Sequence, residues 1–261
     1  MGKLVDYSAQ DGIAVLQLDA PPANTCSYDL LRDLDDAILQ ARLDEKVYCI
    51  ILRGKGDKFF CGGADIQMLK EKSSEFLYYF CLLLQETIRR LEVTPKIVIA
   101  ALNGHALGGG LEMALGCDFR LAKRGAFKIG LPEVNLGQGP GGGGTQRLPR
   151  ILGYARAVEL LTTGRLLSAE EALAIGLVHH VYEAETYWDD VLAFARQFCP
   201  PNKPPRAIGK VKLAARASLE TGIAEGVLIE HEILQPLYDS EDLKEGIDAF
   251  LNHRKAIYRG R

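Results

Sequence analysis

The sequence predicts an α/β fold with parallel strands, because short apolar runs alternate with longer segments of helical periodicity. The runs 13–18, 49–52 and 97–102 are too short for helices and are typical of strands. Segments 27–42 and 76–91 lie between them and have the apolar spacing of amphipathic helices. Parallel neighbours need a crossover connection, which is usually a helix, so this alternation favours a parallel sheet.

The pattern changes after the proline-rich stretch 200–205, which breaks any preceding helix. From 206 to 255 the chain has helical character and no convincing strand. We therefore expect a division into residues 1–200 and 201–261, although about fifty residues is small for an independent domain. An apolar stripe in the second part predicts packing within or between subunits; it consists of Leu228, Ile229, Ile233, Leu234 and Leu237.

Composition is that of a compact soluble enzyme. A chain of 261 residues with 48% hydrophobic and 25% charged residues can bury a sizeable core. Its formal net charge of −3 gives no general attraction to nucleic acid or to an anionic membrane, so we expect neither partner. The sequence has no signal peptide or membrane segment that we recognise, which together with the cysteine content leads us to expect a cytoplasmic protein.

The six cysteines do not indicate a metal site. They form no C-x-x-C pair and have no histidine at metal-ligand spacing, so we expect no metal and interpret them as buried thiols in a reducing compartment. Cys61, beside a glycine turn, could be a nucleophile, but no base is placed for it by the sequence.

Two glutamates lie close to glycine-rich turns. Glu112 ends the string GGGLE at 108–112, and Glu133 precedes glycines at 137, 139 and 141–144. Glycines let backbone N–H groups approach a ligand, and a carboxylate in the following helix can reach the same ligand. Either segment alone is compatible with a tight turn and a solvated acid. Together with a third segment, 61–66, they indicate a binding site.

These segments resemble the crotonase, or enoyl-CoA hydratase/isomerase, family. The matching strings are FCGGADI at 60–66, NGHALGGGLE at 103–112, PEVNLG at 132–137 and GGTQRL at 143–148, and weaker similarity covers nearly the whole chain. The resemblance implies a crotonase-like spiral of repeated ββα units in residues 1–200, which would hold the CoA site and the catalytic glutamates. It also implies a C-terminal helical segment, residues 201–261, that covers the active site and builds a homotrimer or a dimer of trimers.

The same resemblance implies the catalytic residues. It places the two N–H donors that stabilise a thioester enolate on Ala64 and Gly109, and the acid–base pair on Glu112 and Glu133. We favour Glu112 as the group that activates water and Glu133 as the proton donor to carbon. Losing one donor of such an oxyanion hole typically raises the barrier by about 3–4 kcal/mol.

The resemblance also implies the residues that bind the CoA part of the substrate, and no other cofactor is expected. The matched positions are Ala23, Gly62, Ala64, Asp65, Ile66, Gln67 and, from a neighbouring subunit, Phe250. Many relatives have a lysine where this chain has Gln67 or His253, so a phosphate contact at these positions is not expected to be retained.

Gln138 and Gly139 depart from the family pattern, which has two bulky aliphatic residues before the turn at 140–141. The change could widen or wet the acyl pocket, or Gly139 could simply relieve backbone strain at a positive φ.

Three functions are compatible with the resemblance. The presence of both glutamates favours a 2-enoyl-CoA hydratase. The alternatives are an enoyl-CoA isomerase and a non-catalytic CoA-binding or RNA-binding member, and the negative net charge argues against RNA. We expect no nicotinamide cofactor, because the glycine strings lack the strand and the distal acid of a dinucleotide-binding unit.

Overall fold

Two β-sheets organise the chain. In the computed structural model, which describes residues 3–261, the larger sheet has the order β1-β2-β3-β5-β7-β9 and the smaller has the order β4-β6-β8. The strands of the larger sheet are Val5–Gln10, Ile13–Leu18, Cys49–Gly54, Ile97–Leu102, Phe119–Lys123 and His180–Tyr182. Those of the smaller sheet are Phe59–Cys61, His105–Leu107 and Ile129–Gly130. All pairs are parallel except β1 with β2.

The chain winds between the two sheets as a spiral. Each turn adds one strand to the larger sheet and one to the smaller sheet, as in β3-β4, β5-β6 and β7-β8. A helical segment then connects this turn to the next strand of the larger sheet. These helical segments are α2 (Ile66–Glu71) with α3 (Ser74–Val93), α4 (Gly109–Leu115), and η1 (Glu133–Leu136) with α5 (Gly144–Leu152). The predicted spiral of ββα units is therefore confirmed.

Helix α1 (Tyr28–Leu43) illustrates how local sequence sets these elements. The side chain of Ser27 caps its first turn by accepting the N–H of Leu30. Its buried residues recur at helical spacing and face the sheet; they are Leu30, Leu31, Leu34, Ala37, Ile38 and Ala41. Both predicted helices agree with the structure to within two residues at each end.

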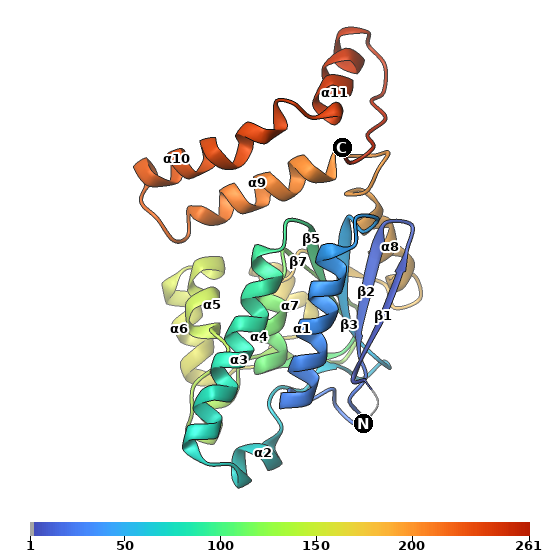
Figure 1. Cartoon of the computed structure of the whole chain (residues 1–261). Helices are drawn as coiled ribbons and strands as arrows, with labels where there is room; N and C mark the ends of the chain where they lie inside the picture. The colour runs from blue at the N-terminus through green and yellow to red at the C-terminus, as the bar shows by residue number, and fades with distance from the viewer. Residues whose placement is uncertain (1–2) are drawn as a thin grey trace.

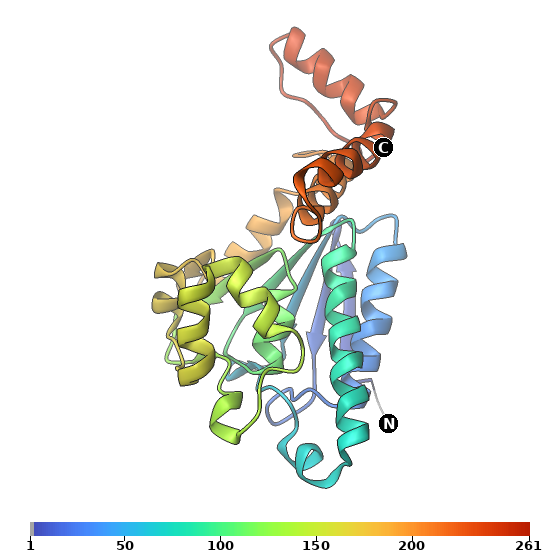
Figure 2. The same ribbon diagram turned by 90° about the vertical axis from the view of Figure 1, so that its left-hand side faces the viewer.

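Both faces of the larger sheet are covered (Figure 2). Along β3, Ile50 and Leu52 belong to the core that includes α1, α3 and α4. The alternate residue Ile51 belongs to a second core, which includes Val191 of α8 (Tyr187–Arg196). Burial on both faces explains why the strands have continuous apolar runs.

The C-terminal helices stand beyond one end of the sheet (Figure 1). They are α9 (Pro205–Ala217), α10 (Ile223–Leu234), η2 (Gln235–Leu237) and α11 (Glu241–Leu251). Earlier in the chain, α6 (Tyr154–Thr163) and α7 (Ala169–Ala174) precede β9 and α8. Lys212 of α9 lies 2.7 Å from the carboxylate of Asp118 and anchors the helix to the core.

Helix α10 has no buried residue, and Leu228 of the predicted apolar stripe is 70% exposed. The other members of the stripe, Ile229, Ile233, Leu234 and Leu237, are partly buried, so within this one chain the stripe is covered only in part. The division of the chain at residues 200 and 201 stays a prediction. Among residues 3–261, no helix combines the length and the apolar character needed to cross a bilayer.

Candidate active site

Two glycines allow the segments after β4 and β6 to lie against each other. Gly63 and Gly108 have φ values of 92° and 52°, a region that side chains disfavour. A Cβ atom on Gly63 would lie 2.8 Å from the carbonyl oxygen of Leu107, and one on Gly108 would lie 2.9 Å from Oε1 of Glu133. A larger residue at Gly63 would push the two segments apart, and one at Gly108 would displace the carboxyl of Glu133.

This close approach brings the predicted N–H donors together. Gly109 is the first residue of α4, so its N–H has no partner within the helix. A Cβ atom built on Gly109 would lie 3.9 Å from the backbone nitrogen of Ala64. In the described part of the chain, neither N–H donates to another backbone group. The two donors are therefore adjacent and available to a ligand.

A cavity of about 150 Å³ lies against these donors. Its lining contains all four predicted catalytic residues, Ala64, Gly109, Glu112 and Glu133. Much of the remaining wall is apolar and includes Ile66, Leu69, Phe80, Leu84, Leu107 and Leu136. The cavity thus combines an apolar surface with a few convergent polar groups, as is typical of small-molecule sites.

Glu112 lies on α4 and is almost fully buried, with 1% exposure. Its Oε1 accepts a 2.7 Å hydrogen bond from the backbone N–H of Gly144. The pKa of this carboxyl is raised, chiefly by burial, and the N–H groups of Gly144 and Gly142 and the charge of Arg147 offset part of the rise. These donors favour the ionised form, which can accept a proton.

Glu133 begins the short helix η1, whereas the sequence pattern had suggested a carboxylate further inside a helix. Its Oε2 is buried and has no hydrogen-bond partner among the described residues. Burial raises the pKa of Glu133 to about 7, and the nearby charge of Glu112 adds to this effect. A carboxyl group with that pKa can hold a proton and release it near neutral pH.

The predicted CoA-binding residues are only partly brought together. Gly62 and Ile66 line the cavity, and the N–H of Gly62 donates to the carbonyl oxygen of Ala23, which places Ala23 beside it. Asp65 caps α2 by accepting the N–H of Gln67 at 2.8 Å. The side chain of Gln67 is exposed and donates to Glu71.

Phe250 does not lie at this cavity. It is 81% exposed on α11, at the opposite end of the molecule from α2 (Figure 1). Within one chain it cannot contact a ligand held near Gly62.

Gln138 and Gly139 are both exposed and both line the cavity, at its open side. The φ of Gly139 is not in the left-handed region, and a Cβ atom there would meet no heavy atom within 4 Å. The alternative that Gly139 relieves backbone strain at a positive φ is therefore wrong. The structure favours the other interpretation, that the missing side chain leaves the cavity wider.

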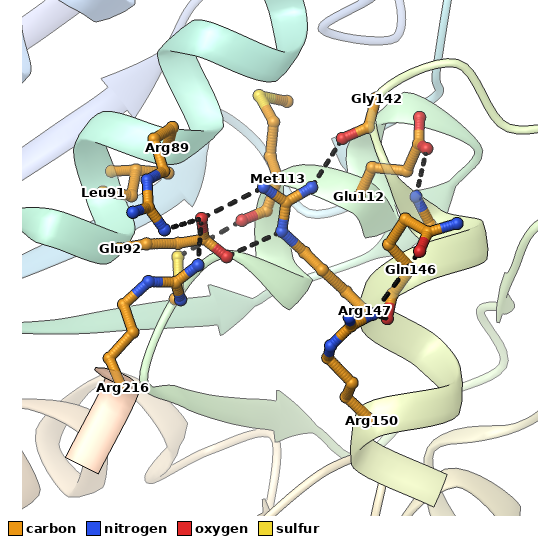
Figure 3. Close-up of polar contacts among 12 residues, drawn as sticks. Arg89, Leu91, Glu92, Glu112, Met113, Gly142, Gln146, Arg147, Arg150 and Arg216 are labelled. Atoms are coloured by element: carbon orange, nitrogen blue, oxygen red, sulfur yellow. Dashed lines mark hydrogen bonds and ion pairs between the residues drawn. The ribbon is translucent and has the colours of Figure 1, made fainter. Parts of the chain in front are cut away.

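Sequence reasoning missed two groups near the cavity. Cys81 lines it, and burial raises the pKa of this thiol, as expected for an unreactive cysteine. Arg147 lies behind the cavity, where it contacts the carbonyl oxygen of Gly142 and the buried carboxylate of Glu92 (Figure 3). The position of Arg147 in the matched string GGTQRL could have marked it as part of the site. Its contact with Glu92 could not be predicted, because the two residues are 55 positions apart in the sequence.

The fold and the cavity are those of an acid–base enzyme, with two N–H donors able to stabilise an oxyanion and two buried carboxyls whose pKa values are raised. Comparison with known proteins agrees. The model of the family described as enoyl-CoA hydratase/isomerase matches residues 8–261. This chain belongs to that family.

Two hydratases align with this chain over more than nine tenths of their own length. The crotonyl-CoA hydratase of Syntrophomonas wolfei is 40% identical over 95% of each chain. The short-chain-enoyl-CoA hydratase of Clostridium acetobutylicum is 38% identical over 93% of this chain and 92% of its own. A crystal structure of an enoyl-CoA hydratase from Geobacillus kaustophilus HTA426 superposes with a TM-score of 0.96 and 37% identity, covering 100% of this chain and 98% of that one.

Proposed function

We propose that this protein is a 2-enoyl-CoA hydratase, which adds water reversibly across the 2,3 double bond of a trans-2-enoyl-CoA to give a 3-hydroxyacyl-CoA. The observation that carries the proposal is the pair Glu112 and Glu133, two buried carboxyls that line one cavity beside two free backbone N–H groups. The names of the relatives support the same reaction.

The thioester carbonyl oxygen is the group that we assign to the N–H donors of Ala64 and Gly109. Attack at C3 moves an electron pair through C2 to this oxygen, and fixed donors stabilise the resulting enolate. Since both donors belong to the backbone, they need no rearrangement during the reaction. Each is expected to lower the barrier by about 3–4 kcal/mol.

The two glutamates then move the protons. The Glu112 carboxylate accepts a proton from water as the water oxygen bonds to C3. The Glu133 carboxyl gives its proton to C2 as the enolate collapses to the thioester. Water has then been added in full, and transfer of the proton from Glu112 to Glu133 restores the starting state.

Isomerisation is the alternative reaction. Shifting a double bond requires one carboxyl to move a proton between two carbons, so Glu133 alone would suffice. A second buried carboxylate held by Gly144 has no role in that reaction, which favours hydration. A non-catalytic CoA-binding or RNA-binding role leaves the raised pKa of Glu133 without a use.

We further propose that the CoA moiety is bound along Ala23, Gly62, Asp65, Ile66 and Gln67. Phe250 would reach it from a neighbouring subunit, in a homotrimer or a dimer of trimers. The support for assembly is the apolar surface of α10 and α11, where Leu228, Phe250 and Leu251 are 70%, 81% and 69% exposed.

No metal or other cofactor is part of the proposed reaction, because the two carboxyls and the two N–H donors supply the acid, the base and the oxyanion stabilisation. A chelator should leave activity unchanged. Loss of activity with a chelator and its recovery with one added metal would contradict this. We also propose a cytoplasmic location, supported by six free cysteines.

The test of the proposed function is direct. Purified protein mixed with crotonyl-CoA should remove the absorbance of the enoyl thioester and form 3-hydroxybutyryl-CoA, and longer and branched enoyl-CoAs then define the substrate range. A 3-enoyl-CoA supplied in parallel measures isomerase activity. Fast isomerisation without hydration would favour the alternative.

A further inference from the structure

A buried carboxylate outside the cavity pairs with three arginines, two of them at hydrogen-bond distance and the third, Arg89, with its Nη1 at 3.9 Å. Glu92, near the end of α3, is 5% exposed. Its carboxylate accepts hydrogen bonds of 2.7 and 3.1 Å from Nε and Nη2 of Arg147, and Nη2 of Arg216 lies 2.7 Å from its Oε2 (Figure 3). The bidentate geometry fixes the plane of the Arg147 guanidinium.

Arg147 has a second contact that Arg216 lacks. Its Nη1 donates a 2.7 Å hydrogen bond to the carbonyl oxygen of Gly142. Gly142 is two residues before Gly144, whose N–H donates to Oε1 of Glu112. One side of the 142–144 loop therefore contacts the Arg147 guanidinium, and the other contacts the Glu112 carboxylate.

The loop is held tightly between these two groups. A Cβ atom on Gly142 would lie 2.7 Å from Oε2 of Glu112, and one on Gly143 would lie 2.3 Å from Nη1 of Arg147. With no side chains in between, the position of the guanidinium sets the position of the loop, and the loop sets the orientation of Glu112.

We propose that Arg147 is a positioning residue for the reaction, which acts by holding the 142–144 loop so that Glu112 points its carboxylate at the water to be activated. The inference rests on the proposed hydratase function. A misplacement of about 1 Å at a reacting group can lower a rate by roughly 100-fold, so a residue that does not touch substrate can control the rate.

The alternative is that Arg147 only neutralises the buried charge of Glu92. Arg216 does this as well, and it has no contact with the loop. Replacing either arginine leaves Glu92 paired with the other, so neither variant creates a lone buried charge. Arg216→Met is therefore a matched control for Arg147→Met.

The experiment measures kcat and KM for crotonyl-CoA in the wild type, Arg147→Met, Arg147→Lys and Arg216→Met. Arg147→Met is expected to lower kcat by about 10- to 100-fold with little change in KM, and Arg216→Met by less than about threefold. Arg147→Lys keeps the charge but loses the planar fork, so an intermediate kcat is expected. Equal losses in Arg147→Met and Arg216→Met would overturn the proposal.

A pH profile gives a second readout. Loss of the Arg147 charge and of the Gly144 hydrogen bond should raise the pKa of Glu112, which moves the acidic limb of kcat/KM to higher pH in Arg147→Met only. The other titratable groups near Glu112 are Glu133 and the thiols of Cys26 and Cys81, whose pKa values are raised, so the thiols stay neutral over this range. An unchanged acidic limb would contradict the proposal.

A third measurement needs no activity. Hydrogen–deuterium exchange of the unliganded protein should be faster in the peptide covering 139–146 in Arg147→Met, and unchanged there in Arg216→Met. If the wild type fails to hydrate enoyl-CoAs, the proposed function is wrong, and this exchange result still decides whether Arg147 holds the loop. Equal exchange in both variants would refute that role.

Discussion

Glu112 and Glu133 line the same cavity, yet Glu112 accepts a 2.7 Å hydrogen bond from Gly144 whereas Oε2 of Glu133 is buried without a partner. Hydrogen bonds to a carboxylate favour its ionised form, and burial without partners favours the protonated form. Burial raises the pKa of both groups, but the N–H groups of Gly144 and Gly142 and the charge of Arg147 oppose this rise at Glu112, which suits Glu112 for the base and Glu133 for the acid.

The pH dependence of hydration should show this asymmetry. Glu133 must be protonated to deliver a proton to C2, and its pKa is raised to about 7. We therefore expect kcat/KM for hydration to fall above pH about 7, approaching tenfold per pH unit. Glu133→Gln should remove this limb and lower the rate by about 10²- to 10⁴-fold. A wild-type profile that stays flat from mildly acidic to alkaline pH would contradict the assignment.

The same residue should weaken the fold at alkaline pH. Since the pKa of Glu133 is higher in the folded state than its ordinary value of 4.5, the folded protein binds more protons between these values. Its contribution to the free energy of unfolding then falls as pH rises from 4.5 to about 7 and stays low above that. Glu133→Gln should be more stable than the wild type by roughly 1–3 kcal/mol at pH 8.

Urea unfolding at two pH values tests this stability difference. The advantage of Glu133→Gln should vanish near pH 4, where the wild-type carboxyl is protonated in both states. An advantage of equal size at both pH values would point to packing instead of charge.

Gly139→Ile should narrow the substrate range. The residue lines the cavity, lacks a positive φ, and has open space where a Cβ atom would lie, so the fold should tolerate the change. Each buried CH₂ of a substrate contributes roughly 0.8 kcal/mol, so displacing one or two should shift kcat/KM toward crotonyl-CoA by about tenfold or less. Gly139→Ala should give a smaller shift. Equal losses on short and long substrates would disprove the pocket interpretation.

Removal of the C-terminal helices should abolish both assembly and activity. A chain ending at Pro205 loses α10 and α11, which have the exposed apolar residues, and almost all of α9, including the ion pair of Lys212 with Asp118. Light scattering should show an oligomer for the full chain. Full activity in a monomer would contradict the role of Phe250 at a subunit boundary, and Phe250→Ala should then leave KM unchanged.

Periodicity was sufficient to predict the long elements. The strands at 13–18 and 97–102 and the helices α1 and α3 follow from apolar spacing, because burial of one face dominates their sequences. The strands of the smaller sheet, with two or three residues each, are too short to have a period, and only the resemblance to a known family predicted their winding. The antiparallel pairing of β1 with β2 was not predicted either.

The features of the site also divide into those that the sequence predicted and those that it did not. Glycine strings and nearby glutamates indicated a binding site, and the resemblance to the family predicted the roles of Ala64, Gly109, Glu112 and Glu133; the cavity contains all four residues. The raised pKa values of the two glutamates depend on burial and, at Glu112, also on the hydrogen bond from Gly144, which are three-dimensional properties. The contact of Arg147 with Glu92 joins α5 to α3 and has no local sequence pattern.

The most direct test of the central claim, that two glutamates acting together add water, compares the wild type with Glu112→Gln on crotonyl-CoA. The enoyl-thioester absorbance and the 3-hydroxybutyryl-CoA formed are measured together, with crotonyl-CoA binding as the control for an intact site. We predict hydration by the wild type and a loss of about 10²- to 10⁴-fold in Glu112→Gln with binding retained. Hydration by Glu112→Gln at the wild-type rate, or no hydration by the wild type, would contradict the account.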